Sequence, residues 1–204
     1  MKILVATTNP GKLAELIAML EGRVEFINLS ALANIREVQE DGKTFAENAQ
    51  KKALGYAEQS GLWTIADDSG LVVDALGGDP GVMSARFSGR KISDRQLLDH
   101  ENMAKVLNLL EGIPEQKRGA RFVCSLCLAN AEKVLIETEG TVEGIITEKE
   151  IGQNGFGYDP IFFLPRLNKT VAQLTAKEKN AISHRGDALK KLKPLLEELL
   201  KENL

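Results

Sequence analysis

Short apolar runs alternate along the chain with segments in which apolar residues recur every three or four positions. Residues 2–6 and 24–28 are short apolar runs typical of strands, and residues 12–21 between them have helical spacing. The expected buried face of that helix consists of Leu13, Leu16, Ile17 and Leu20. The chain therefore opens with a predicted strand-helix-strand unit.

A second helix is predicted over residues 44–60, because apolar side chains recur there at every fourth position. Thr44 and Glu47 fit a capping box, in which the side chain of each residue satisfies a backbone N–H near the helix start. The repeating apolar residues are Phe45, Ala49, Ala53 and Ala57. The chain then returns as a predicted strand over residues 63–66.

The second half of the chain continues this alternation. Helical spacing predicts a helix over 94–110, and residues 120–129 and 134–142 are typical of a long antiparallel strand pair. A glycine-rich loop over 152–163 leads into a short apolar strand, and a leucine-rich helix over 187–200 closes the chain, with Pro194 as a candidate kink. Alternating strands and helices without a linker predict an α/β fold with residues 1–204 in one domain.

The composition of the chain limits the classes of molecule that we expect the protein to bind. The 204 residues are 43% hydrophobic and 27% charged, with a net charge of −3, which gives no general attraction to nucleic acid or to an anionic membrane. The apolar run at the start is too short for a signal sequence or a membrane span, and no later run reaches that length. We therefore expect a cytoplasmic protein with neither nucleic acid nor membrane as a partner.

Cys124 and Cys127 form a C-x-x-C pattern, which in other settings indicates a redox pair or half of a zinc site. They lie in a predicted buried strand, where residues three apart point to opposite faces. The chain has no second cysteine pair and only two histidines. We therefore expect two buried free thiols.

Two adjacent carboxylates, Asp67 and Asp68, follow the predicted strand at 63–66 and precede Ser69 and Gly70. Acids at a strand end hold hard oxygen ligands at the rim of a pocket, where magnesium bound to substrate phosphates shares them. The same four residues are also typical of an ordinary turn. From this segment alone, both interpretations stay open.

Residues 7–12, TTNPGK, lie between the first strand and the first helix. Free amide groups at a helix N-terminus, together with Thr and Asn side chains and Lys12, suit an anion. A phosphate-binding P-loop is excluded because Ala6 and Leu13 occupy positions where that motif needs Gly and Ser or Thr. The alternative is a plain helix start with Asn9 as N-cap and Pro10 at the first helical position.

Three other segments carry candidate chemistry. Glu40 lies in an acidic loop, and Lys51 and Lys52 on the following helix are more often solvated than functional. The loop at 155–160, GFGYDP, brings backbone close to a planar ligand and offers a Phe ring for stacking, although a tight turn explains it equally well. Residues 183–186, SHRG, start the last helix with a Ser cap and two side chains able to hydrogen-bond a base.

Five blocks in order resemble the inosine triphosphate pyrophosphatase family: TTNPGK, the ED-G-x-TF-x-ENA segment, ADDSGL with its LGG-x-PG-x-x-SAR continuation, GFGYDPIFF and ISHRG. The blocks span nearly the whole chain, and together they are far more specific than any one alone. The resemblance implies a long mixed β-sheet flanked by helices, in two lobes around a central nucleotide-binding cleft. It also implies a magnesium-dependent homodimer that hydrolyses ITP, dITP and XTP to the monophosphate and pyrophosphate.

The resemblance further implies a role for individual residues. Glu40 and Asp68 would hold Mg²⁺, and Asp68, with Asp67 beside it, would orient or deprotonate the attacking water. The residues expected to bind the triphosphate are Thr7, Thr8, Asn9, Pro10, Gly11, Lys12 and Lys52, with Ser69 also touching the substrate. The residues expected around the base are Phe156 as the stacking ring, Gly157, Tyr158, Asp159, Lys179, His184 and Arg185.

Two other functions remain compatible with the sequence. One is a pyrophosphatase for other modified nucleotides, pyrimidines included, and turnover across a nucleotide panel separates it. The other is a non-catalytic nucleotide-binding module, which would not need the three carboxylates of Glu40, Asp67 and Asp68 near a phosphate cradle.

Overall fold

The computed structural model describes residues 1–20, 24–32 and 34–202. Its strands are β1 (Lys2–Val5), β2 (Glu25–Asn28), β3 (Trp63–Val73), β4 (Gly119–Ala129), β5 (Val134–Ile146), β6 (Phe162–Leu164) and β7 (Lys169–Thr170). Its α-helices are α1 (Pro10–Leu20), α2 (Phe45–Ser60), α3 (Arg95–Leu109), α4 (Ala176–Ile182) and α5 (His184–Glu202). The 3-10 helices are η1 (Leu29–Ala31), η2 (Asp74–Leu76), η3 (Gly81–Arg86), η4 (Glu115–Lys117), η5 (Asp159–Ile161) and η6 (Val171–Gln173).

The strands form one seven-stranded sheet in the order β2-β1-β3-β4-β5-β6-β7. Strand β1 is parallel to both β2 and β3, whereas β6 is antiparallel to β5 and β7. Strands β4 and β5 are joined by the turn at 130–133, in which the Asn130 N–H donates to the Lys133 carbonyl at 3.1 Å. So short a connection permits only an antiparallel pair. The predicted α/β class with a mixed sheet is confirmed.

The chain divides into two compact units. Unit 1 comprises Met1–Asp68, Cys124–Gly140 and His184–Leu204, and unit 2 comprises Ser69–Val123 and Thr141–Ser183. Strands β3, β4 and β5 each contribute residues to both units. Both units are therefore assembled from segments that are discontinuous in the sequence.

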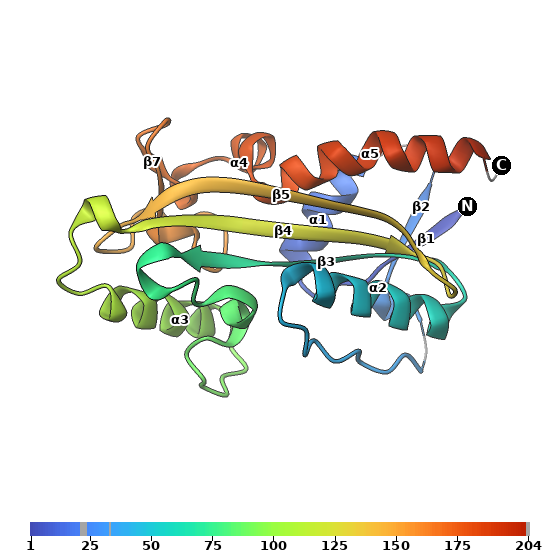
Figure 1. The fold of residues 1–204 in the computed structure, drawn as a ribbon, viewed down its shortest axis with the longest axis horizontal. Helices are drawn as coiled ribbons and strands as arrows, with labels where there is room; N and C mark the ends of the chain where they lie inside the picture. Colours follow the sequence, from blue (N-terminus) through green and yellow to red (C-terminus); the bar gives the residue numbers. More distant parts are fainter. Residues whose placement is uncertain (21–23, 33, 203–204) are drawn as a thin grey trace. The chain divides into compact units, whose positions relative to one another are not determined.

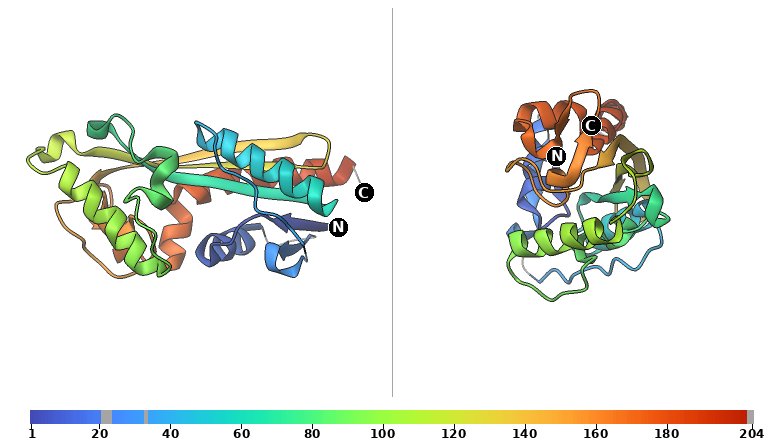
Figure 2. Two further views of the ribbon diagram at one scale, coloured as in Figure 1. Left: turned by 90° about the horizontal axis from the view of Figure 1, so that it is seen from below. Right: turned by 90° about the vertical axis from the view of Figure 1, so that its left-hand side faces the viewer.

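In unit 1 strands β1 and β4 are buried on both faces. Ile3 and Val5 of β1 pack with α1 and α5, whereas Leu4 packs with α2 on the other face. Figure 1 shows α5 and α2 on opposite sides of the strands, and in the left-hand view of Figure 2 α2 lies in front of them and α5 behind. Because successive strand residues point to opposite faces, the continuous apolar runs of β1 and β4 follow from this double cover.

The two cysteines follow the same alternation along β4. Cys124 packs with the apolar cluster under α1 and α5, and Cys127 packs with the cluster under α2. Both are buried free thiols, as expected. Burial raises the pKa of each thiol to about 12, so both are protonated at neutral pH.

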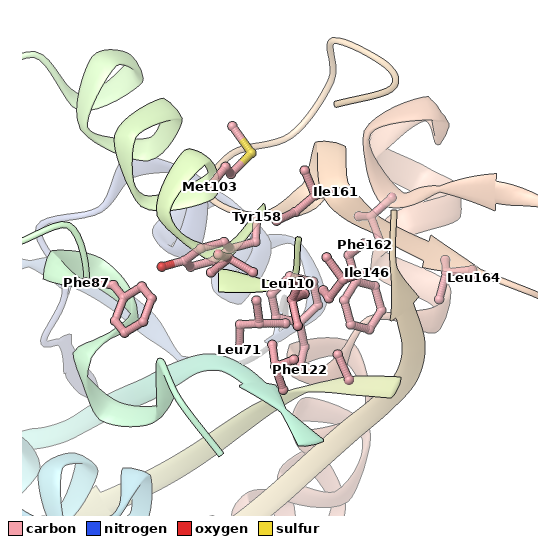
Figure 3. Close-up of a cluster of buried hydrophobic side chains, with 14 of the residues drawn as sticks. Leu71, Phe87, Met103, Leu110, Phe122, Ile146, Tyr158, Ile161, Phe162 and Leu164 are labelled. Carbon is pink, nitrogen blue, oxygen red and sulfur yellow. The ribbon is translucent and has the colours of Figure 1, made fainter. Parts of the chain in front are cut away.

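The core of unit 2 is an apolar cluster below α3, which Figure 3 shows in close-up. Met103 and Val106 of α3 reach it with the helical spacing that the sequence predicts. Phe122 and Phe162 pack with ring centroids 4.3 Å apart. Tyr158 of the glycine-rich loop also lies in this cluster, so the loop is anchored directly to the core.

Helix boundaries differ from the predictions in several places. Helix α1 begins at Pro10, two residues earlier than predicted, and its predicted end at residue 21 lies outside the described residues. Ile17, predicted to face the core, is 38% exposed. Helix α5 begins at His184, three residues before the predicted leucine-rich range of 187–200, so residues 184–186 start the last helix as the SHRG segment predicted. Ser183 directly before it is the C-cap of α4.

The predicted capping box at the start of α2 is only half formed. Thr44 Oγ1 accepts from the Glu47 N–H at 3.1 Å, as expected. The Glu47 carboxylate, however, accepts from the Lys43 N–H at 2.7 Å, one residue before the cap. The two predicted side chains therefore both bind backbone N–H groups at the helix start, but Glu47 binds the N–H of Lys43 and not that of the cap residue Thr44.

The largest difference concerns β3, which continues from Trp63 through Asp67, Asp68 and Gly70 to Val73. The predicted strand end at residue 66 is wrong, and so is the ordinary turn that was one of the two interpretations of these residues. A Cβ atom at Gly70 would overlap with Ser84 Oγ, so glycine is needed here for the close approach of η3 and not for a turn. The adjacent aspartates consequently lie within a strand and point to opposite faces of the sheet.

Within the described residues, the structure contains no helix with the length and apolar character needed to cross a membrane.

Candidate active site

Asp67 lies at the centre of a buried group of charges on the α1 and α5 face of β3. Its Oδ2 atom is 2.9 Å from Lys12 Nζ and 3.1 Å from Arg185 Nη2. Arg185 also pairs through Nη1 with Glu15. The side chains of Asp67 and Arg185 are each only 1% exposed. Two cations and two carboxylates thus connect α1, β3 and α5 with their charges balanced.

Local structure explains how these side chains meet. Lys12 and Glu15 are three residues apart on α1, so they share one face of the helix. Arg185 lies in the first turn of α5, and that turn packs closely against Gly140 of β5. A Cβ atom at Gly140 would overlap with the His184 carbonyl oxygen and the Ala188 nitrogen. Glycine at this strand position therefore lets Arg185 reach Asp67.

The electrostatic balance keeps Asp67 ionised. Burial is the largest single influence and raises its pKa, but Lys12, Arg185 and Lys52 together outweigh it and leave the pKa far below the usual range for an aspartate. Burial of Arg185 likewise lowers its pKa, and Asp67 and Glu15 more than compensate, so the guanidinium remains charged. Asp67 is therefore a permanent counterion for the two cations.

Asp68 lies on the opposite face of β3, beside α2. Its Oδ2 atom accepts from Asn48 Nδ2 at 2.9 Å, and Asn48 Oδ1 accepts from the Gly42 N–H at 2.8 Å. Lys52, one turn further along α2, donates through Nζ to Glu40 Oε2 at 3.0 Å. Asn48 thus holds both Asp68 and the loop that carries Glu40.

Asp68 differs electrostatically from its neighbour. Burial raises its pKa, and Lys52 and the Asn48 hydrogen bond offset this only in part, so the net shift is upward. For Lys52, burial lowers the pKa, but Asp67, Asp68 and Glu40 together raise it. Lys52 is not solvated, as such helix positions more often are, but is only 8% exposed and is charged; its predicted role in binding the triphosphate stays a prediction.

The donor set beside α2 fits a magnesium ion. Glu40 and Asp68 supply carboxylate oxygens, the ligands that Mg²⁺ prefers, and each contributes to the charge around Lys52. Among the described residues no group of three or more His, Cys, Asp or Glu side chains is arranged to hold a metal. Two carboxylates are nevertheless the usual protein share of a Mg²⁺ site completed by substrate phosphates and water. The magnesium requirement stays a prediction.

The loop at residues 7–9 prepares the start of α1. Asn9 Oδ1 accepts from the N–H groups of Gly11 at 2.9 Å and Lys12 at 3.3 Å, while Thr7 Oγ1 accepts from the Asn9 N–H at 3.2 Å. Asn9 therefore caps the helix, as one of the two interpretations of this segment predicted, and α1 begins at Pro10. Thr8 is exposed. Phosphate binding by residues 7–12 stays a prediction.

In unit 2, Asp159 organises the glycine-rich loop. Its Oδ2 atom accepts from the Phe156 N–H at 2.9 Å and from Lys179 Nζ at 2.7 Å. Lys179 Nζ also lies 4.1 Å from the centre of the Phe156 ring, over its face. Gly155 has φ +80°, and a Cβ there would overlap with the Asp159 carboxylate. The loop thus presents a partly exposed Phe ring with a cation against it.

The same loop is tied to two other elements of unit 2. The Gly157 N–H donates to Asp99 Oδ2 on α3 at 2.8 Å, and Tyr158 Oη donates to the Ser84 carbonyl of η3 at 2.7 Å. Burial, the largest influence, raises the pKa of Tyr158, so its hydroxyl keeps its proton. Because the Tyr158 ring lies in the core cluster, it anchors the loop rather than offering a surface to a ligand.

The structure thus separates the predicted residues into three groups. Lys12, Asp67 and Arg185 form one group, and Glu40, Lys52 and Asp68 form a second, both in unit 1. The third, in unit 2, comprises Phe156, Gly157, Tyr158, Asp159 and Lys179.

Some predicted residues lie differently from expectation. Asp67 and Asp68 do not form a carboxylate pair, because their side chains point to opposite faces of β3. Ser69 is a partly exposed strand residue, and His184 is buried at the start of α5. The guanidinium of Arg185 binds carboxylates, so its contact with a base stays a prediction.

Sequence reasoning missed Glu15, Asn48 and Asp99. For Glu15 and Asn48 a signal was present, since Glu15 follows Lys12 by three residues and Asn48 precedes Lys52 by four, which places each pair on one helix face. Asp99 carries no such signal, because its partner Gly157 lies 58 residues away in the chain.

Comparison with known proteins places this arrangement in a family. A model of the Ham1 family matches residues 3–195. The chain is 48% identical over 204 residues to a dITP/XTP pyrophosphatase from Exiguobacterium sibiricum, covering 99% of this chain and 100% of that protein. It is 47% identical over 195 residues to a dITP/XTP pyrophosphatase from Bacillus subtilis, covering 95% of this chain and 96% of that protein.

Solved structures agree with the sequence comparisons. A HAM1 protein from Coxiella burnetii superposes with a TM-score of 0.87 at 40% identity, covering 97% of this chain and 99% of that one. A dITP/XTP pyrophosphatase from Mycobacterium abscessus superposes with a TM-score of 0.77 at 47% identity, covering 95% and 100%. The resemblance inferred from the five sequence blocks is confirmed, and the chain belongs to the Ham1 family.

Proposed function

We propose that this protein is a nucleoside triphosphate pyrophosphatase that hydrolyses deaminated purine nucleotides, ITP, dITP and XTP, to the monophosphate and pyrophosphate. The observation that carries the proposal is the position of Asp68, held by Asn48 beside the Lys52–Glu40 pair. The names of full-length relatives, which are dITP/XTP pyrophosphatases, support the same substrate class.

The reaction joins a water oxygen to the α-phosphorus and breaks the bond from that phosphorus to the bridging oxygen of pyrophosphate. Asp68 orients the water and accepts its proton, because its pKa is raised by burial whereas that of Asp67 is strongly lowered by Lys12 and Arg185. Lys12 and Lys52 stabilise the negative charge of the phosphates and of the leaving pyrophosphate. Magnesium bound by Glu40 and Asp68 would supply further charge neutralisation.

The proposal gives Asp67 a supporting role. Its carboxylate positions Lys12 and is a counterion for that lysine and for Arg185. In unit 2 the Phe156 ring stacks on the purine, while Lys179 and Asp159 hold the ring in place. The predicted contacts of His184 and Arg185 with the base belong to the same proposal.

The deciding experiment measures initial rates on ITP, XTP, GTP, ATP, their deoxy forms and a modified pyrimidine triphosphate, with magnesium and with EDTA. We expect magnesium-dependent release of pyrophosphate and monophosphate from ITP, dITP and XTP. Release of orthophosphate and a diphosphate would contradict attack at the α-phosphorus. Binding without turnover would indicate a nucleotide-binding module, and preference for the pyrimidine would redirect the substrate class.

Two further features of the proposal are the homodimer and the cytoplasmic location. Both are expected from the resemblance of the sequence to the family and from substrates that belong to the nucleotide pool. Light scattering coupled to size-exclusion chromatography is expected to give twice the mass of one chain.

A further inference from the structure

Asp99 is a buried carboxylate in the first turns of α3 whose main partner is a backbone amide of the glycine-rich loop. The residue is 8% exposed, and its Oδ2 atom accepts from the Gly157 N–H at 2.8 Å. Its Oδ1 atom is 3.1 Å from Arg95 Nε, one turn earlier on the same helix. Asp99 therefore connects α3 to the residue that follows Phe156.

The loop around Phe156 is held on both sides of that residue. Asp159 binds the Phe156 N–H from within the loop, and Asp99 binds the next N–H, that of Gly157, from α3. Gly157 has φ +61°, a conformation with few steric constraints on a glycine. Without the tether from Asp99, the backbone at this glycine is free to rotate.

A carboxylate is a costly choice for a merely structural tether. Burying a charge is unfavourable unless it is paired, and a neutral acceptor would satisfy one backbone N–H equally well. Hydrogen bonds to an ionised acceptor are shorter and stronger than neutral ones, so a carboxylate fixes the direction of the amide more firmly. Arg95, which is half exposed, compensates part of the buried charge.

We propose that Asp99 is a positioning residue for base recognition: by holding the Gly157 amide, it fixes the orientation in which the Phe156 ring meets the purine. This inference rests on the proposed function, in which Phe156 stacks on the base. The described contacts of Asp99 are with the Gly157 amide and with Arg95, both in unit 2. Its contribution therefore appears in substrate binding and not in the rate of hydrolysis.

The test compares Asp99→Ala, Asp99→Asn and the control Arg95→Gln. We expect Asp99→Ala to raise KM for ITP and XTP about fivefold or more, with kcat within about twofold of wild type, because a hydrogen bond to a charged group is lost. Asp99→Asn keeps an oxygen acceptor and should recover part of this loss. Arg95→Gln leaves the Gly157 hydrogen bond intact and should keep KM within about twofold.

A double-mutant cycle with Phe156→Ala separates positioning from general stability. If Asp99 acts through the Phe156 ring, Asp99→Ala adds little to KM once that ring is absent. An equal rise in KM in both backgrounds, or an unchanged KM in Asp99→Ala, would overturn the proposal. If Asp99→Ala does not fold, as judged by its thermal transition, the same double-mutant cycle is measured with Asp99→Asn.

Dissociation constants for ITP, measured by titration calorimetry in EDTA, repeat the cycle without relying on turnover. They also distinguish the two proposals. A wild-type protein that binds ITP in EDTA but does not hydrolyse it when magnesium is present contradicts the proposed function and leaves the Asp99 comparison intact. A wild-type enzyme with normal turnover and an Asp99→Ala variant with unchanged affinity contradicts only the role of Asp99.

Discussion

The two faces of β3 carry adjacent aspartates in opposite electrostatic settings. Asp67, 1% exposed, has Lys12 and Arg185 within 3.1 Å, whereas Asp68, 7% exposed, has the neutral amide of Asn48 at 2.9 Å. The pKa of the first is strongly lowered and that of the second is raised. One register step along a strand thus separates a fixed counterion from a carboxylate whose raised pKa suits it to accept a proton.

The sharpest test of this comparison is Asp68→Asn. The change removes the proposed base and one metal ligand, so we expect kcat on ITP to fall about 1,000-fold, while the free energy of unfolding changes by less than about 1 kcal/mol. Steady-state kinetics and urea unfolding measure the two quantities. Asp41→Asn, which alters an exposed carboxylate near Glu40, is the matched control and should keep full activity. More than about a tenth of wild-type turnover in Asp68→Asn would contradict the assignment.

For Asp67→Asn we expect the opposite result, in which folding stability is lost more than catalytic rate. Removing this carboxylate leaves Lys12 and Arg185 with too little countercharge in a buried setting. We expect the free energy of unfolding to fall by about 3 kcal/mol or more, as is typical when one partner of a buried ion pair is removed. Urea unfolding measures it, and a loss no greater than that of Asp68→Asn would show that the two faces do not differ.

A smaller effect is expected from Arg185→Lys, which keeps the charge but loses the fork that joins Asp67 to Glu15. We expect a loss of about 1–2 kcal/mol in the free energy of unfolding. The same variant tests the predicted base contact: a lower ratio of kcat/KM for ITP over ATP would place the guanidinium at the base, and an unchanged ratio would restrict it to the two carboxylates.

The smallest expected effect is that of Asn48→Ala on the Asp68 face. Without Asn48 Nδ2, Asp68 loses one hydrogen bond but keeps its charge, so we expect kcat to fall about tenfold. Gln50→Ala, on the same helix and bonded only to Glu137 in the described contacts, is the control and should leave kcat unchanged. A loss equal to that of Asp68→Asn would mean that Asn48 itself takes part in the reaction.

Much of the fold followed from local signals. Helix α2 was predicted by its Thr44 cap and its regularly spaced alanines, and both are present in the structure. Strand β3 was predicted too short because Asp67, Asp68 and Gly70 are typical turn residues. They remain in a strand because Lys12, Asn48 and Ser84, all distant in sequence, satisfy or pack against them. Tertiary contacts here override local propensity.

The candidate site was predicted less completely than the fold. The five blocks located Asp68, Glu40 and Phe156, yet they did not show that the two aspartates point apart. That separation requires knowing that the strand continues, because alternation of side chains holds only within a strand. Glu15, Asn48 and Asp99 were missed since each acts on another residue and carries no chemistry of its own in the sequence.

The discontinuous make-up of unit 1 has a consequence for the newly synthesised chain. Strand β1 leaves the ribosome well before α5, but one apolar face of β1 is covered in part by Ala188, Leu189 and Leu192 of that helix. Arg185, one of the two cations that neutralise Asp67, arrives with the same helix. Unit 1 therefore reaches its packed and charge-balanced state only after α5 has been synthesised, so a chain that stops before α5 would lack both stability and the proposed activity.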